Sequence, residues 1–584
     1  MKYALLPFLL FAAVLLRAET VLPPDTPVFA APAHNSPIIA VFREAVALES
    51  LPPDTSIIAK HPLARYFMFT PVRLPDGRAG FADTSVRLRA KPGGGYTIVF
   101  SPYRPLWRDL LIGLAAIGLV LLGYDWHRKK KARWYHWAGI PALVRILLVL
   151  IVIQRAGNLI ASPMDEVGYY ANLASFLKGD FSTPWHFTVG TSILYAPFAL
   201  ILGARHYGDI AIPFSLFAAL VLAPGMLVLG YFVGKKLTGS ALKSSLAMLL
   251  WAAWPFFNHH FAGFGIKRFW SYFALPSANF DFAHYVNLIG ASYNGMSDTP
   301  STCAVLGVMA IVLYGKPKWH TAAVAGLLYG FACTIRINNI LFAPVLMLMV
   351  LYFQRPLFNF RAFLTAGAAF VLGFLPQFAA NAYFFGSPFR FSYTNYAGGA
   401  HTYLHWVFFR LTAAYYGAAN HVCWSLAAAA LLWMRDRKLR LLLTVWAVPV
   451  ILFFTLYSHG TDDAIRFVLT SYPAMFLAIT SCGIWETLTK RGWGAAAAYF
   501  AVLACFPPNA TDAGRLIWYP WRTTAAVFSV SAVRSRAMGF FATAGLLYLF
   551  GNGYILIALL SAALVYAAGE NLYFALRRDS SSMR

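Results

Sequence analysis

The chain has few charged residues, and carboxylates are the scarcer kind. Charged residues make up 12% of its 584 residues, with 22 Asp and Glu against 47 Lys and Arg, while 59% of the residues are apolar. So little charge over such a length excludes an ordinary soluble globular protein. Apolar stretches of about 15 to 25 residues recur along almost the whole chain, which predicts a polytopic α-helical membrane protein.

Cysteine is scarce as well, with five in the chain. All five fall in or beside apolar runs, and the polar N-terminal segment has none. Free cysteine is among the most buried residue types, so this placement predicts neither a disulfide framework nor a cysteine-bound metal. We expect no required cofactor.

The formal net charge is +25, which raises the question of nucleic-acid binding. A nucleic-acid-binding domain gathers its Lys and Arg on one soluble face. Here they lie in short loops between apolar runs, as the positive-inside rule requires of a membrane protein. We therefore expect a lipid bilayer as a partner and no nucleic acid.

The N-terminal residues indicate export. The stretch "MKYALLPFLLFAAVLLRAET" reads as a signal peptide over residues 1–18, cleaved near Ala18, or else as an uncleaved anchor. Residues 20–92 are polar and rich in Pro and Gly, with alternating runs such as "SPIIAVF", and so predict a small all-β module. Its end, "DGRAGFADTSVRL", resembles a bacterial SH3-like domain, but Phe81 stands where that family usually has Trp.

The remainder, residues 107–584, predicts about 13 membrane spans. The first, at 107–124, ends in the basic "HRKKKARWYH", which marks a cytoplasmic turn, so the second, at 137–157, returns outward. An exterior loop at about 158–209 follows. The later spans are predicted at 210–233, 244–258, 298–315, 319–335, 340–354, 362–380, 417–434, 441–457, 467–486, 493–507 and 538–568, the last as one helix or two. We expect the inner, cytoplasmic membrane, with the β module and the exterior loop on the periplasmic side.

Carboxylates are confined to the ends of the predicted spans. Thirteen follow residue 130, and on this topology nine face outward: Asp165, Glu166, Asp180, Asp209, Asp281, Asp298, Asp462, Asp463 and Asp512. None needs to lie at mid-membrane, where proton relays and ion-coupled transporters keep theirs. Any chemistry is therefore expected at the outer membrane–water boundary.

The pair Asp165 and Glu166, in "SPMDEVGYY", has two interpretations. In the structural one, Ser162 caps a helix with Asp165 at its third position, close to a capping box. The apolar face of that helix would then be formed by Val167, Tyr170, Leu173 and Leu177. Glu166 points roughly 100° away from Asp165 around the helix and has no part in the cap. In the functional interpretation both carboxylates belong to a site, where a divalent ion is also conceivable.

Several segments resemble the GT-C superfamily of membrane glycosyltransferases. The similarity begins with a span and an exterior loop that opens on Asp-Glu, and it is greatest to the bacterial relatives of dolichyl-phosphate-mannose protein mannosyltransferases, which include lipid A aminoarabinose transferases. Within residues 137–490, five further segments match in order: "STPWHFTVGTSILYAPFALILGA", "YNGMSDTPSTCAVLGVMAIVLYGK", "GLLYGFACTIRINNILFAP", "NAYFFGSPFRFSY" and "AIRFVLTSYPAMFLAI". The resemblance implies transfer of a sugar from a polyprenyl-phosphate carrier to a glycan, glycolipid or protein outside the membrane.

The resemblance also implies roles for single residues. Asp165 matches the family's catalytic aspartate, and so it would be the base that takes the acceptor's proton in an inverting displacement. Glu166 would support it or orient the acceptor. Cations must meet the leaving lipid phosphate; Arg336 and Arg466 are the first choices and Lys267 and Arg268 the next. The alternative for these four is snorkelling at the interface.

Three further points stay open on sequence alone. Asp298 in "SDTP" is either the N-cap of its helix or a substrate contact. Asp462 and Asp463 either balance Arg466 or belong to the site. The whole chain is alternatively a transporter or flippase of a lipid-linked glycan, a ligase of such glycans, or an envelope scaffold. Transport predicts charged residues within the spans and repeat symmetry, which the sequence does not make evident.

Overall fold

A computed structural model describes the arrangement of most of the chain. It covers residues 20–22, 25–31, 36–44, 46–51, 70–82, 86–90, 96–100, 106–152, 165–185, 187–204, 207–259, 296–391, 423–456, 467–487, 560–571 and 573. The predicted signal peptide and the predicted span at 493–507 lie outside these residues.

The N-terminal part consists of antiparallel strands. Six form one sheet in the order β1-β4-β5-β6-β2-β3, and β7 and β8 form a separate hairpin. Their bounds are β1 Thr20–Leu22, β2 Pro27–Phe29, β3 Ile38–Val41, β4 Val46–Ser50, β5 Thr70–Arg73, β6 Ala79–Ala82, β7 Val86–Ala90 and β8 Tyr96–Phe100. The all-β prediction agrees with these strands, although they continue past residue 92 to Phe100. The SH3-like topology stays a prediction.

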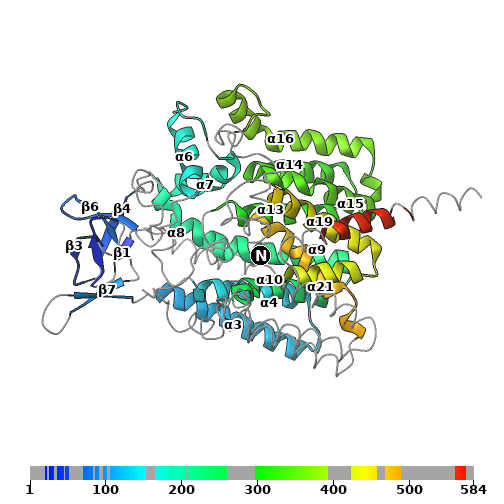
Figure 1. The fold of residues 1–584 in the computed structure, drawn as a ribbon, viewed down its shortest axis with the longest axis horizontal. Helices are drawn as coiled ribbons and strands as arrows, with labels where there is room; N and C mark the ends of the chain where they lie inside the picture. The colour runs from blue at the N-terminus through cyan, green and yellow to red at the C-terminus, as the bar shows by residue number, and fades with distance from the viewer. Residues whose placement is uncertain are drawn as a thin grey trace, which may run out of the picture.

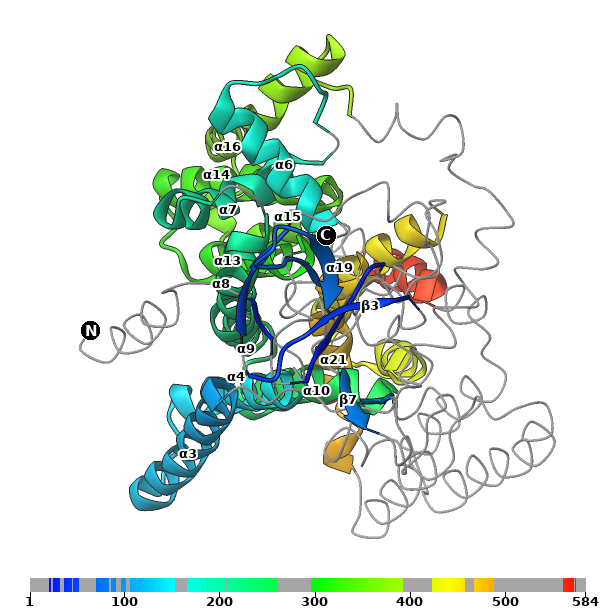
Figure 2. The same cartoon turned by 90° about the vertical axis from the view of Figure 1, so that its left-hand side faces the viewer.

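The sheet closes over a small apolar core. Leu22, Val28, Leu48, Val72 and Leu74 are buried together in it, because the alternation of each strand turns its apolar residues to one face. The strands lie at one end of the helical part, the end at which α6 (Asp165–Lys178) and α7 (Val189–Leu202) also lie (Figures 1 and 2). This common end is what the prediction of one shared compartment requires.

The rest of the described chain is helical. Besides α6 and α7 its elements are α3 Leu106–Lys129, α4 Trp134–Val152, α8 Tyr207–Phe217, η2 Ala218–Leu222, α9 Ala223–Thr238, α10 Ala241–His259, α13 Asp298–Tyr314, α14 Trp319–Ile335, η5 Ile337–Phe342, α15 Ala343–Phe353, η6 Arg355–Leu357, α16 Phe360–Phe385, α19 Arg437–Leu456, η7 Leu469–Ser471, α21 Tyr472–Ser481 and η8 Trp485–Thr487. Further helix covers Cys423–Trp433 and residues 560–571.

Four of the described helices are long and apolar enough to cross a membrane. They are Leu110–Lys129, Pro213–Thr238, Phe360–Phe385 and Arg437–Thr455, and seven shorter apolar helices accompany them. A predicted span coincides with each of these four, and α13 and α14 begin at the predicted residues. The count of about 13 spans stays a prediction.

The two ends of the helical body differ in charge. Asp298 opens α13 at one end, and α13 finishes at Tyr314, whose ring lies 5.6 Å from the Lys236 ammonium at the end of α9. Lys243, at the start of α10, pairs with Glu486 at 2.6 Å. The basic turns therefore gather at the end away from Asp298, in the pattern that the positive-inside rule predicts.

Candidate functional site

Helix α6 carries Asp165 and Glu166 in its first turn, and the two side chains lie in different surroundings. Asp165 is half-buried, whereas Glu166 is completely buried. Both are acidic groups at a helix N-terminus, where the helix dipole favours negative charge. Ser162 and Pro163 lie outside the described residues, so the capping interpretation stays a prediction.

The buried face of α6 differs from the predicted one. Tyr169, Tyr170 and Leu173 are buried in a cluster with residues of α7 and α8, whereas Leu177 is 46% exposed. The predicted face was therefore wrong at Leu177, and it left out both Tyr169 and Glu166. The predicted face did include Tyr170, which is buried as expected.

Tyr169 joins α6 to the first turn of α13. Its hydroxyl donates a hydrogen bond to Ser297 Oγ at 2.9 Å, and Ser297 directly precedes Asp298. Its carbonyl oxygen accepts from Ser192 Oγ of α7 at 2.8 Å, and its ring lies 4.8 Å from that of Phe187. The carboxylates of α6 are thus held at a fixed distance from the N-terminus of α13.

Asp298 does not act as an N-cap. Ser297 occupies the N-cap position, without a side-chain cap hydrogen bond, and Asp298 is the first residue of α13. The Asp298 side chain is 1% exposed and forms an ion pair with Arg336 Nη1. The capping interpretation is therefore wrong, because the carboxylate pairs with the guanidinium instead, and a substrate contact of Asp298 stays a prediction.

Arg336 follows the last residue of α14 and is held on two sides. Its side chain is 13% exposed, and its guanidinium carbon lies 4.8 Å from the centre of the Phe467 ring. The dipoles of α13 and α14 further stabilise this ion pair, because Asp298 lies at a helix N-terminus and Arg336 at a helix C-terminus. The snorkelling alternative is wrong for Arg336, since its charged end turns to a buried carboxylate.

A cluster of polar residues next to the Asp298–Arg336 ion pair holds the C-terminal end of α14 in place. Asn339 is buried, and its Nδ2 donates to the Ala332 carbonyl at 2.6 Å and to Ser301 Oγ at 2.8 Å. Thr302 of α13 and Thr470 of η7 join by a hydrogen bond of 2.8 Å between their hydroxyls. Sequence reasoning missed these residues. The signal for Asn339 was the polar run "RINN" at the close of an apolar helix.

Helix α7 docks its first turn on the same end of α14. Thr188 Oγ1 donates to the Ile335 carbonyl at 2.8 Å, and the Val189 amide donates to Gln377 Oε1 at 3.0 Å. A Cβ on Gly190 would overlap the amide nitrogen of Ile335, so only glycine permits this approach. The predicted exterior loop is thereby anchored one residue away from Arg336.

Two buried phenols of this region, those of Tyr207 and Tyr170, have raised pKa values. Burial raises the pKa of Tyr207 well above its ordinary value, and the negative charge of Glu166 raises that pKa further. Burial, with a contribution from the charge of Asp209, raises the pKa of Tyr170 to about 12. Both hydroxyls therefore stay neutral over the physiological range and cannot act as bases there.

Arg145 is a buried charge that sequence reasoning overlooked. It lies in α4, inside the predicted span 137–157, and is 1% exposed. Its Nη1 donates to the Ala252 carbonyl of α10 at 2.9 Å, and no carboxylate pairs with it among the described residues. The expectation that the spans hold no evident charge is therefore wrong at this position.

The remaining predicted site residues lie outside the described chain. These are Lys267, Arg268, Arg466, Asp462 and Asp463, although Phe467, next to Arg466, contacts Arg336. In the described part, no group of three or more His, Cys, Asp or Glu is placed to hold a metal ion. Cys303, Cys333, Cys423 and Cys482 are free thiols.

Comparison with known proteins finds similarity to a solved structure. No protein-family model and no curated protein matches the chain. The fold is similar to the crystal structure of ArnT from Cupriavidus metallidurans bound to undecaprenyl phosphate, at 14% sequence identity and a TM-score of 0.39. The match covers 74% of this chain and 77% of that one. Such a match is too weak to carry an assignment of function.

Proposed function

We propose that the chain is an integral-membrane glycosyltransferase of the inner membrane. In this proposal it moves a sugar from a polyprenyl-phosphate carrier to an acceptor on the periplasmic side. The observation that carries it is the hydrogen bond between Tyr169 and Ser297. That bond couples the helix of Asp165 and Glu166 to the helix whose first residue pairs with Arg336, which supports a site that uses both a carboxylate and this cation.

Asp165 is the proposed base. The acceptor hydroxyl attacks the anomeric carbon while the bond from that carbon to the phosphate oxygen breaks, and Asp165 takes the hydroxyl proton. The bonding electrons leave with the lipid phosphate, and the anomeric centre inverts. Asp165 suits this role because it is half-buried, at the margin between the helical body and its surroundings.

Glu166 is proposed as a positioning residue. Its side chain is completely buried, so it does not meet the acceptor directly. Its charge acts on the phenol of Tyr207, and it neighbours Asp165 in sequence. From this buried place Glu166 would fix the first turn of α6, on which Asp165 lies.

Arg336 is proposed to meet the leaving phosphate, with Arg466, Lys267 and Arg268 as further cations. Arginine suits this role because its planar guanidinium presents several N–H donors to phosphate oxygens. Asp298 and the Phe467 ring orient the Arg336 guanidinium. Orientation in advance lowers the cost of stabilising charge that develops in the transition state.

The proposal is tested by sugar transfer in membranes that contain the chain. Polyprenyl phosphate carrying a labelled sugar is supplied, and both the labelled acceptor and the released lipid phosphate are measured. We expect equal amounts of the two products, since each transfer releases one lipid phosphate. Movement of the labelled donor across the membrane without release of lipid phosphate would contradict the proposal.

One observation favours transport as a second candidate. A buried arginine inside a span, as Arg145 is, occurs in proteins that carry charged substrates through the bilayer. Transport of a lipid-linked glycan would use Arg145 rather than Asp165. Reconstituted vesicles distinguish the two, because transport needs no acceptor and leaves the sugar–phosphate bond intact.

A further inference from the structure

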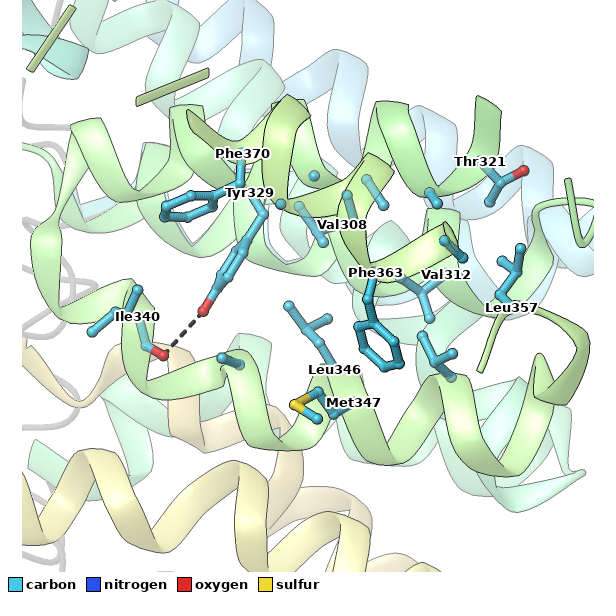
Figure 3. A pocket seen from close by; sticks show the side chains of 18 residues that line it. Val308, Val312, Thr321, Tyr329, Ile340, Leu346, Met347, Leu357, Phe363 and Phe370 are labelled. Carbon is cyan, nitrogen blue, oxygen red and sulfur yellow. Dashed lines mark hydrogen bonds between the residues drawn. The ribbon is translucent and has the colours of Figure 1, made fainter. Parts of the chain in front are cut away.

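An apolar groove lies between α13, α14, α15 and α16. Its volume is about 360 Å³, and Val308, Val312, Leu346, Met347, Phe363 and Phe370 are among the residues that line it (Figure 3). We refer to it as the α14–α16 groove. Its two hydroxyls are already bonded, that of Tyr329 to the Ile340 carbonyl at 3.1 Å and that of Thr321 to the Lys316 carbonyl. The groove therefore suits a hydrocarbon chain.

Glycines shape the wall of this groove. A Cβ on Gly326 would overlap the Ala366 carbonyl oxygen, so this glycine allows α14 and α16 to approach closely, as small residues do in membrane helices. Gly367 has a different role. No atom lies within 4 Å of the place where its Cβ would be, and it lines the groove. The missing side chain of Gly367 thus leaves space that a ligand can fill.

Four cations are close in sequence to residues at one end of the groove. Thr321 and Leu357 line that end (Figure 3), and the exposed Lys316, Lys318, Arg355 and Arg361 lie within five residues of one or the other. Gln354 Nε2 donates to the Gly315 carbonyl at 2.8 Å, which ties the two basic loops together. Leu357 packs on Ala322 and Ala362 and so closes the groove between them.

Among the residues that the structure describes, no carboxylate pairs with the cations at this end. The sequence has no Asp or Glu between residues 299 and 435. In the described part of the chain, none of the four cations forms an ion pair. Their like charges repel one another unless an anion comes between them.

We propose that the α14–α16 groove binds an anionic phospholipid of the leaflet that faces the basic loops. One acyl chain lies in the groove, and the headgroup phosphate lies between Lys316, Lys318, Arg355 and Arg361. Basic pockets between membrane helices hold anionic headgroups in this manner. The basic end that would hold the headgroup is at the opposite end of α13 and α14 from Asp298 and Arg336. It therefore does not depend on the proposed sugar transfer.

The headgroup contact is tested with the purified, delipidated full chain in detergent. Binding of phosphatidylglycerol is titrated against phosphatidylcholine with the same acyl chains, by native mass spectrometry. We expect the chain to bind phosphatidylglycerol in clear preference to phosphatidylcholine. The double variant Arg355→Gln with Arg361→Gln should bind phosphatidylglycerol about 25-fold more weakly, because each cation contributes about fivefold to the affinity. The control is Arg128→Gln with Lys131→Gln, an exposed basic pair at the end of α3 that should leave affinity unchanged.

The acyl contact is tested by filling the groove. Gly367→Phe should abolish selective binding, whereas Gly123→Phe, at an equally open glycine of α3, should not affect it. Equal affinity for the two lipids, or an unchanged affinity in the Arg355 and Arg361 double variant, would overturn the proposal. Because the arginine variants change only exposed side chains, they decide the matter even if Gly367→Phe fails to fold. A dimer that forms through the groove and excludes lipid would also overturn it.

Discussion

Asp298 and Arg336 form an ion pair that joins the first residue of α13 to the residue after α14, 38 positions apart. Both side chains are largely withdrawn from solvent, at 1% and 13% exposure. Removal of one partner of such a pair is costly, because it leaves the other charge desolvated. The pair is at once a structural contact and the proposed means of orienting Arg336.

Arg336→Gln should lower the free energy of unfolding by about 3 kcal/mol, since Asp298 then remains buried without its cation. Asp298→Asn combined with Arg336→Gln should recover part of this loss. Unfolding of the purified protein with increasing denaturing detergent measures the difference. Arg128→Gln, on an exposed residue of α3, is the control. A double variant as unstable as the sum of the two single variants would contradict the coupling.

Tyr169→Phe and Tyr170→Phe form a matched pair on α6. Each removes one hydroxyl, which donates to Ser297 Oγ in the first case and to the Ala204 carbonyl in the second, both at 2.9 Å. Each should cost about 1 kcal/mol of stability. Only Tyr169→Phe should also reduce the rate of sugar transfer, because only that bond couples α6 to α13. Equal effects on transfer would argue against the coupling.

Gly190→Ala should destabilise the protein by about 2 kcal/mol, because the added methyl group meets the backbone of Thr334 and Ile335. Gly113→Ala in α3, where nothing lies within 4 Å, should instead stabilise its helix by up to about 1 kcal/mol. Thermal unfolding in one detergent compares the two. If the glycine variants shift stability in the same direction, the contact between α7 and α14 is looser than described.

Arg145→Met should stabilise the protein or leave it unchanged, because methionine fills similar space without a buried charge. Glycosyl transfer should survive this substitution. The thermal midpoint and the transfer rate are measured on the same preparation. A stable Arg145→Met variant that loses transfer would contradict this prediction and would give Arg145 a part in the transfer reaction.

The sequence alone was sufficient for what depends on local apolar pattern. Hydropathy located α13 and α14 at their observed first residues, and turn residues indicated the strands before residue 92. Topology also predicted that Asp165, Asp298 and Arg336 share one end of the helices. The alternating direction of successive spans was enough to put all three residues at that end, without any knowledge of how the helices pack.

Pairing across helices could not be predicted in this way. The Asp298 carboxylate fitted an N-cap equally well by local pattern, and only the packing of α14 against α13 brings Arg336 to it. Burial of Glu166 depends on contacts with α7 and α8, which are remote in sequence. Hydropathy did not single out Arg145, because one charge scarcely lowers the mean hydropathy of a 19-residue helix.

The role of Asp165 is tested most directly by transfer of labelled sugar from polyprenyl phosphate by the Asp165→Asn variant. Asn keeps the shape and can still cap a helix, so it removes the proposed base and little else. Asp180→Asn, at an exposed aspartate beyond α6, is the matched control. The account predicts that Asp165→Asn abolishes transfer at unchanged thermal stability, while Asp180→Asn retains it. Full transfer by Asp165→Asn would contradict the account and return Asp165 to helix capping.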